Sequence, residues 1–123
     1  MEKLSGSLED YLEAIYIEVL KHDCAKVTDI AAALNVKKAS VTSALNQLAA
    51  KKLINYAPYS SVTMTSDGEK LAKKILQKHK VLDMFFGEIL ELENASEIAC
   101  AVEHLISDEN LKKINRFISR ISS

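Results

Sequence analysis

The stretch that decides the fold runs from Val27 to Thr65 and reads VTDIAAALNVKKASVTSALNQLAAKKLINYAPYSSVTMT. Thr28 or Asp29 begins a short helix, and Asn35-Val36-Lys37 breaks it, since Asn tolerates the left-handed backbone that a tight turn needs. A second helix is expected over 38–51. Its inward-facing apolar residues recur at helical spacing: Val41, Ala44, Leu45 and Leu48. Two short helices joined by a tight turn are typical of a helix-turn-helix.

Two short strands are expected directly after this pair of helices. Residues 53–56 and 62–65 are rich in β-branched and aromatic residues, and the loop over 57–61 keeps Pro58 out of the strand pairing. Helix, turn, helix and then a β-hairpin is the element order of a winged helix-turn-helix. The segment is therefore predicted to adopt that fold.

Further helices are expected on both sides of this segment. Before it, Ser7 reads as the N-cap of a helix that ends near residue 22. One side of that helix is apolar: Leu8, Tyr11, Leu12, Ile15, Tyr16, Val19 and Leu20. After it, helices are expected over 67–90, from the Asn94 cap to about 106, and from Ser107 to about 121. With one Pro and three Gly in 123 residues, the chain is predicted to be mostly α.

Charge is distributed unevenly along the chain. The net charge is −1, but residues 37–80 carry nine Lys and two acids, whereas the flanking blocks 1–36 and 81–123 are each acidic by four charges. A basic middle indicates contact with a polyanion. In a helix-turn-helix the start of the second helix meets the base edges of DNA. The candidate DNA-binding residues are therefore Lys37, Lys38, Ala39, Ser40, Thr42, Ser43 and Asn46.

A possible metal site lies near the end of the chain. Cys100, Glu103 and His104 occupy positions i, i+3 and i+4 of the helix expected there, which places a thiol, a carboxylate and an imidazole on one face. Ile98, Val102 and Leu105 are expected to pack on the opposite face. Three more residues offer ligands of the same kinds: Asp10, Glu13 and His79. Spacing alone leaves open a buried, inert Cys and a solvated Glu-His pair.

Several stretches resemble the metal-dependent repressors of the diphtheria toxin repressor and manganese transport regulator type (DtxR/MntR). The most specific are Glu9-Asp10-Tyr11-Leu12-Glu13-Ala14-Ile15-Tyr16 and the run ACAVEHLISD over 99–108. Val41-Thr42, Met64-Thr65-Ser66-Asp67-Gly68 and Lys78-His79 are similar as well. The resemblance implies a winged helix-turn-helix DNA-binding domain over 1–70, then a helical metal-binding and dimerisation domain over 71–123, with the 67–90 helix shared.

The same resemblance implies a function and a ligand set. Such proteins are homodimers that bind operator DNA when Fe(II) or Mn(II) is loaded, and they repress metal-uptake genes. The implied metal ligands are Asp10, Glu13, His79, Cys100, Glu103 and His104. Asp83 is a possible ligand of a second metal, although Ser96 stands where a further His would be expected. The site is a hybrid: Cys100 is typical of iron-type members, whereas Asp10 and Glu13 are typical of manganese-type members. The soft thiolate favours Fe(II), with Mn(II) as the alternative.

Other functions fit parts of the pattern. A metal-independent winged-helix regulator could use Cys100 as a redox sensor, and a winged helix could bind protein instead of DNA. A metalloenzyme is disfavoured, because six protein ligands leave little open coordination for a substrate. Two cysteines and the absence of a leading apolar signal favour a cytosolic protein with thiols, and no apolar run approaches the about 18 residues of a membrane span.

Overall fold

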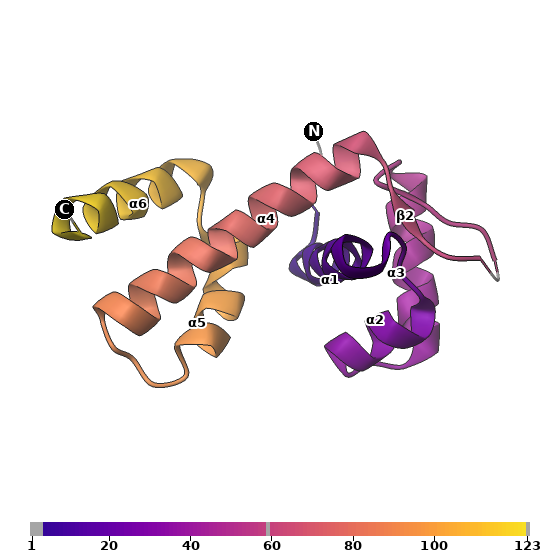
Figure 1. Ribbon diagram of the computed structural model, residues 1–123, viewed down its shortest axis with the longest axis horizontal. Helices are drawn as coiled ribbons and strands as arrows, with labels where there is room; N and C mark the ends of the chain where they lie inside the picture. The colour runs from indigo at the N-terminus through magenta and orange to yellow at the C-terminus, as the bar shows by residue number, and fades with distance from the viewer. Residues whose placement is uncertain (1–3, 59, 123) are drawn as a thin grey trace. The chain divides into compact units, whose positions relative to one another are not determined.

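The computed structural model describes residues 4–58 and 60–122, and these residues are mostly helical, as predicted (Figure 1). The chain divides into an N-terminal unit (Met1–Lys73) and a C-terminal unit (Lys74–Ser123). The division falls within helix α4. The elements in chain order are α1 (Gly6–His22), α2 (Val27–Leu34), α3 (Lys38–Ala50), β1 (Ile54–Asn55), β2 (Thr63–Met64), α4 (Ser66–Met84), the π-helical turn η1 (Phe85–Ile89), α5 (Ala95–Val102), the 3-10 turn η2 (Glu103–Leu105) and α6 (Asp108–Ser122).

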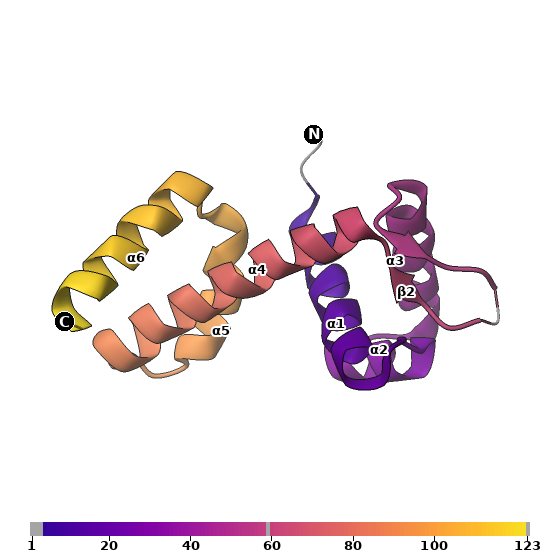
Figure 2. The same ribbon diagram turned by 45° about the horizontal axis from the view of Figure 1, so that its top comes forward.

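The core of the N-terminal unit lies where α1, α2 and α3 pack against one another (Figure 2). Its completely buried side chains come from the apolar positions that the sequence predicts: Leu12, Ile15, Ile30, Val41, Leu45 and Leu48. Each such side chain stabilises the fold by about 1.5–3 kcal/mol through removal from water. The predicted inward face of α3 is therefore confirmed, and the opposite face of that helix is left for solvent or a partner.

Helix α1 begins earlier than expected. Ser5, in extended backbone, is the N-cap, and its hydroxyl accepts a hydrogen bond from the backbone N–H of Leu8 at 3.2 Å. The prediction that Ser7 caps this helix is wrong. The motif favoured Ser7 because an acid, Asp10, stands three residues after it, but a serine hydroxyl caps a helix without such an acid.

The turn between α2 and α3 is the predicted one. Asn35 adopts the left-handed conformation (φ 54°, ψ 51°), and its N–H bonds back to carbonyls of α2. The hairpin that follows is antiparallel but shorter than expected, with Ile54 opposite Met64 and Asn55 opposite Thr63. Val62 instead pairs with Ala25, through two backbone hydrogen bonds of 2.8 and 2.9 Å. The hairpin is thereby tied to the segment that joins α1 and α2.

The C-terminal unit departs from the expected helices at two places. The helix predicted over 67–90 is regular α-helix only to Met84 and ends in η1, which contacts both α5 and α6. The helix predicted to reach residue 106 is α-helical only to Val102 and continues as η2. Leu105, expected to pack, is 83% exposed. A 3-10 turn advances 120° per residue instead of 100°. Side chains after Val102 therefore no longer lie on the faces that a continued α5 would give them.

Helix α6 starts as predicted. The hydroxyl of Ser107 accepts the N–H of Asn110 at 3.1 Å, as an N-cap does. In the same unit the ring of Phe85 makes edge-to-face contacts with Phe86 and with Phe117, at centroid distances of 5.5 and 6.2 Å. Phe117 nevertheless stays 43% exposed. Among the described residues, no helix is long and apolar enough to cross a membrane.

Candidate metal centre and nucleic-acid interface

Three predicted ligands come together in the C-terminal unit. His79 lies on α4, Cys100 on α5 and Glu103 at the start of η2, and one donor atom from each lies within 4.8 Å of the other two. The group offers nitrogen, sulfur and oxygen, a set that suits a divalent transition metal. The local path of the chain brings this group together. Cys100 and Glu103 are three residues apart in the sequence, and α4 places His79 beside them.

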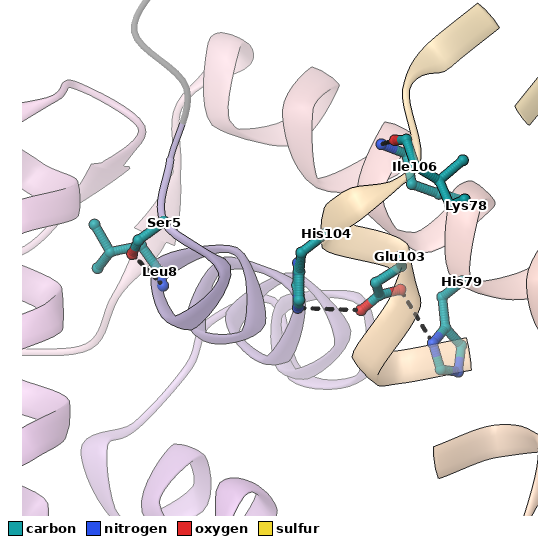
Figure 3. Close-up of polar contacts among 7 residues, drawn as sticks. All are labelled: Ser5, Leu8, Lys78, His79, Glu103, His104 and Ile106. Atoms are coloured by element: carbon teal, nitrogen blue, oxygen red, sulfur yellow. Dashed lines mark hydrogen bonds and ion pairs between the residues drawn. The ribbon is translucent and has the colours of Figure 1, made fainter. Parts of the chain in front are cut away.

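Glu103 is the centre of this group. It is 2% exposed and is the one buried charged residue in the described part of the chain. Its Oε2 lies 3.1 Å from Nδ1 of His79, and its Oε1 lies 3.8 Å from Nε2 of His104 (Figure 3). Burying a carboxylate costs free energy unless positive charge or hydrogen-bond donors compensate. Two imidazoles and a thiol around a buried carboxylate therefore fit a cation.

The neighbours of Glu103 differ in exposure. The side chains of His79 and His104 are 22% and 19% exposed, whereas Cys100 is exposed. The imidazoles are thus held at the edge of the interior, with the thiol on the solvent side.

Two other predicted ligands belong to the N-terminal unit, and a third lies further along α4. Asp10 and Glu13 are half-buried on α1 of the N-terminal unit, three residues apart and therefore neighbours on that helix. Asp83 is half-buried on α4, one turn beyond His79. In the described part of the chain it is not among the residues that gather around His79 and Glu103. Ser96 is exposed on α5.

The candidate DNA-binding residues form an exposed ridge on α3. Lys37, the N-cap of α3, and its neighbours are solvent-exposed: Lys38, Ala39, Ser40, Ser43 and Asn46. Thr42 is half-buried, and its hydroxyl donates to the carbonyl of Lys38 at 3.1 Å. Because the helix buries its other face in the core, this ridge is the surface that a partner can read.

A hollow lies on each side of this ridge. One, of about 800 Å³, is lined by α3 (Lys38, Thr42, Asn46), by the hairpin loop (Tyr56, Pro58, Ser60, Ser61) and by the start of α2 (Lys26, Val27, Thr28). The other, of about 600 Å³, is lined by α1 residues and by Ala39, Ser40, Ser43 and Gln47. Lysine and hydroxyl groups, which this ridge and the two hollows carry, are the kinds of side chain that contact phosphates and base edges in DNA complexes.

Five polar residues that line the first hollow were not predicted from the sequence as DNA-binding residues: Lys26, Thr28, Tyr56, Ser60 and Ser61. Lys26 belongs to the block 1–36, whose net charge is negative, so the charge distribution along the chain did not single it out. Tyr56 and the two serines come from the hairpin, which the sequence places after α3 without showing that it folds back along it. The winged fold itself is the signal that could have found them, because a wing lies beside the reading helix.

A winged helix-turn-helix that exposes lysines at the start of α3, together with a unit that gathers side chains able to bind a metal, is typical of metal-responsive transcriptional regulators. Residues 3–62 match the family described as "Iron dependent repressor, N-terminal DNA binding domain", and residues 65–123 match "Iron dependent repressor, metal binding and dimerisation domain". The chain belongs to this family of iron-dependent repressors. It is accordingly a regulator and not an enzyme, and the family binds operator DNA, binds a divalent metal and dimerises.

Individual relatives agree with this assignment. The chain is 41% identical over 120 residues to an uncharacterized HTH-type transcriptional regulator of Methanocaldococcus jannaschii, covering 95% of this chain and 96% of that one. It is 34% identical over 109 residues to the HTH-type transcriptional regulator MntR of Lysinibacillus sphaericus, covering 88% and 78%.

Two solved structures share the fold. The crystal structure of T. acidophilum IdeR has a TM-score of 0.80 at 25% identity, covering all of this chain and 56% of that one. The structure of the manganese regulator SloR has a TM-score of 0.80 at 24% identity, covering 91% and 53%. The chain thus spans about half the length of these two solved chains.

Proposed function

We propose that this chain is an Fe(II)-responsive repressor of metal-uptake genes that works in the cytoplasm, with Mn(II) as the alternative activator. The observation that carries the proposal is the grouping of His79, Cys100 and Glu103, in which a buried carboxylate is surrounded by an imidazole nitrogen and a thiol sulfur. A bound divalent ion would supply the positive charge that compensates this carboxylate.

Six residues are proposed to hold the ion. Glu103 contributes a carboxylate oxygen, His79 and His104 contribute imidazole nitrogens, and Cys100 contributes the thiolate. Asp10 and Glu13 are proposed as additional carboxylate ligands from α1, on the basis of residue type and of the family to which the chain belongs. Asp83 is proposed as a ligand of a second metal site.

The choice of Fe(II) rests on Cys100. A thiolate is a soft ligand and suits Fe(II) better than Mn(II), whereas the carboxylates suit both ions. The names of similar proteins leave the choice between Fe(II) and Mn(II) open. The family description names iron, whereas the structurally similar SloR is named a manganese regulator. Zn(II) binds tightly to the same kinds of ligand, so tight Zn(II) binding alone does not identify the activator.

The α3 ridge is proposed to read the operator. Lys37 and Lys38 lie at the N-terminal end of α3, where a helix in the major groove meets bases and phosphates. Metal occupancy can favour DNA binding only if the DNA-binding form has the higher affinity for the ion. Reciprocity then requires operator DNA to raise the metal affinity by the same factor.

Anaerobic fluorescence anisotropy with a fluorescent promoter fragment tests this function. Fe(II), Mn(II), Zn(II) and a chelator are compared at one salt concentration, because salt alone changes the affinity for DNA. We expect Fe(II) to tighten binding most and the chelator to abolish it. DNA binding that ignores the chelator but is lost after peroxide treatment would contradict the proposal and favour a metal-independent redox sensor at Cys100.

A further inference from the structure

Lys78 is unusually enclosed for a lysine. It immediately precedes His79 on α4, and its side chain is only 17% exposed, whereas most lysines are solvated. By contrast Lys80, on the other side of His79, is exposed. The enclosure indicates that the ammonium group of Lys78 has a defined partner within the C-terminal unit.

That partner is the end of the turn that carries Glu103 and His104. The Nζ of Lys78 donates a hydrogen bond of 2.8 Å to the carbonyl oxygen of Ile106 (Figure 3), and it lies 3.9 Å from Oδ1 of Asp108. Ile106 has extended backbone (φ −88°, ψ 124°), so it lies outside the helical hydrogen bonding of η2. A hydrogen bond from an ammonium group is roughly twice as strong as one between neutral groups.

Two consecutive α4 residues therefore hold the two ends of one short turn. His79 contacts Glu103 at the beginning of the turn, and Lys78 holds Ile106 at its end. η2 is a three-residue 3-10 turn, which has poorer hydrogen-bond geometry than an α-helix, and Leu105 is 83% exposed and adds little packing.

We infer that Lys78 is a positioning residue of the metal centre, because its bond to Ile106 sets the path of the 103–106 turn and so aims Glu103 and His104. The inference rests on the proposed function, and it assigns Lys78 no contact with the ion. Groups that hydrogen-bond metal ligands typically change the metal affinity by about 10–100-fold when they are removed, and this range is the scale expected for Lys78.

Co(II) titration under anaerobic conditions tests the inference, since Co(II) reports its ligands through d–d absorption and through the thiolate charge-transfer band. The variants are Lys78→Met, which removes the donor, and Lys78→Arg, which keeps a cationic donor. Lys80→Met is the matched control, because it removes a neighbouring positive charge that is exposed. Thermal unfolding of each metal-free variant is measured alongside.

We expect Lys78→Met to raise the Co(II) dissociation constant by about 10–100-fold and to change the d–d spectrum. Lys78→Arg should recover most of the affinity, and Lys80→Met should bind as the wild type does. Wild-type affinity and spectrum in Lys78→Met, even with a lowered Tm, would overturn the inference and leave Lys78 as a structural tie.

If Lys78→Met does not fold, Lys78→Gln takes its place in the Co(II) titration, and the same results support or overturn the inference. The glutamine side chain is too short to reach Ile106 and carries no charge. Failure of the proposed function gives a different result. In that case the wild-type chain itself takes up no Co(II), which overturns both the function and the inference.

Discussion

Nδ1 of His79 lies 3.1 Å from Oε2 of Glu103, so an imidazole of α4 meets a carboxylate of η2 inside the C-terminal unit. Glu103 is 2% exposed, and water therefore does little to compensate its charge. Removing one partner from a buried, charged pair usually costs more than replacing both. Substitutions at this pair and around it are the sharpest tests of the proposed centre.

Glu103→Gln removes the charge but keeps the size of the side chain and one acceptor oxygen. We expect the affinity for divalent metal to fall by more than about 10-fold, as for loss of an important group at a metal site. The metal-free chain should stay folded, because a neutral amide costs less to bury than a carboxylate. Calorimetric titration with Mn(II) and Fe(II) measures the effect. Glu97→Gln, at an exposed α5 position, is the control, and equal metal affinity in the two variants would count against Glu103 as a ligand.

His104→Ala should abolish metal-activated DNA binding and leave the fold intact. His104 belongs to the short η2 turn, and its ring is a proposed ligand rather than part of the apolar core. Anisotropy with operator DNA and circular dichroism are measured on the same samples. His22→Ala is the matched control, since that histidine is exposed at the end of α1. Normal Fe(II) activation of His104→Ala would remove His104 from the ligand set.

Metal choice is expected to follow the softness of the ligands. Cys100→Glu replaces the thiolate by a hard carboxylate and should shift activation toward Mn(II), whereas Asp10→Met should shift it away from Mn(II). DNA affinity is measured with each ion over a concentration series. If the wild type responds equally to both ions and Cys100→Glu alters neither response, Cys100 does not determine the metal and the choice of Fe(II) is wrong.

The double variant Lys37→Ala/Lys38→Ala should bind operator DNA weakly and with a flatter salt dependence. Each phosphate contact that is lost lowers the slope of log affinity against log salt by about 0.9. Metal binding should persist, since neither lysine is among the proposed metal ligands. Lys112→Ala/Lys113→Ala on α6 removes the same charge from exposed positions and serves as the control. A wild-type slope in the α3 variant would exclude these lysines from the interface.

Gly68 tests the junction between the hairpin and α4 independently of function. A Cβ at this position would lie 1.8 Å from the carbonyl oxygen of Leu53, which is backbone and cannot move aside cheaply. Gly68→Ala should therefore lower the free energy of unfolding by at least about 1–3 kcal/mol, the usual cost of overpacking. At Gly87 the nearest atom is the Ala95 Cβ at 3.3 Å, so Gly87→Ala should cost less. Denaturant unfolding of both variants measures the difference, and the reverse order would contradict the described junction.

Much of the N-terminal unit could be predicted because periodicity and turn chemistry act locally. Val41 and Leu45 recur at helical spacing and are buried, and Asn35 adopts the left-handed turn conformation. The starting residue of α1 was predicted wrongly, because the acid three residues after Ser7 favoured that serine whereas Ser5 is the cap. The hollow beside α3 was missed as well, since it exists only once the hairpin folds back.

The candidate metal centre was predictable by residue type but not in its local geometry. The spacing of Cys100, Glu103 and His104 indicated a shared face on a continuous helix. The change to a 3-10 turn at Glu103 instead buries that carboxylate and exposes Leu105. The role inferred for Lys78 depends on a bond to a carbonyl 28 residues away, which no local pattern encodes.

X-ray absorption spectroscopy of the anaerobic Fe(II)-loaded chain tests the central claim most directly, because it reports the atoms bound to the ion. The proposed centre predicts one sulfur neighbour at about 2.3 Å, the usual length of a metal–thiolate bond, together with nitrogen and oxygen neighbours. The sulfur signal should disappear in Cys100→Ser, while the imidazole scattering remains. A wild-type spectrum with nitrogen and oxygen neighbours alone, unchanged in Cys100→Ser and in Glu103→Gln, would contradict the account.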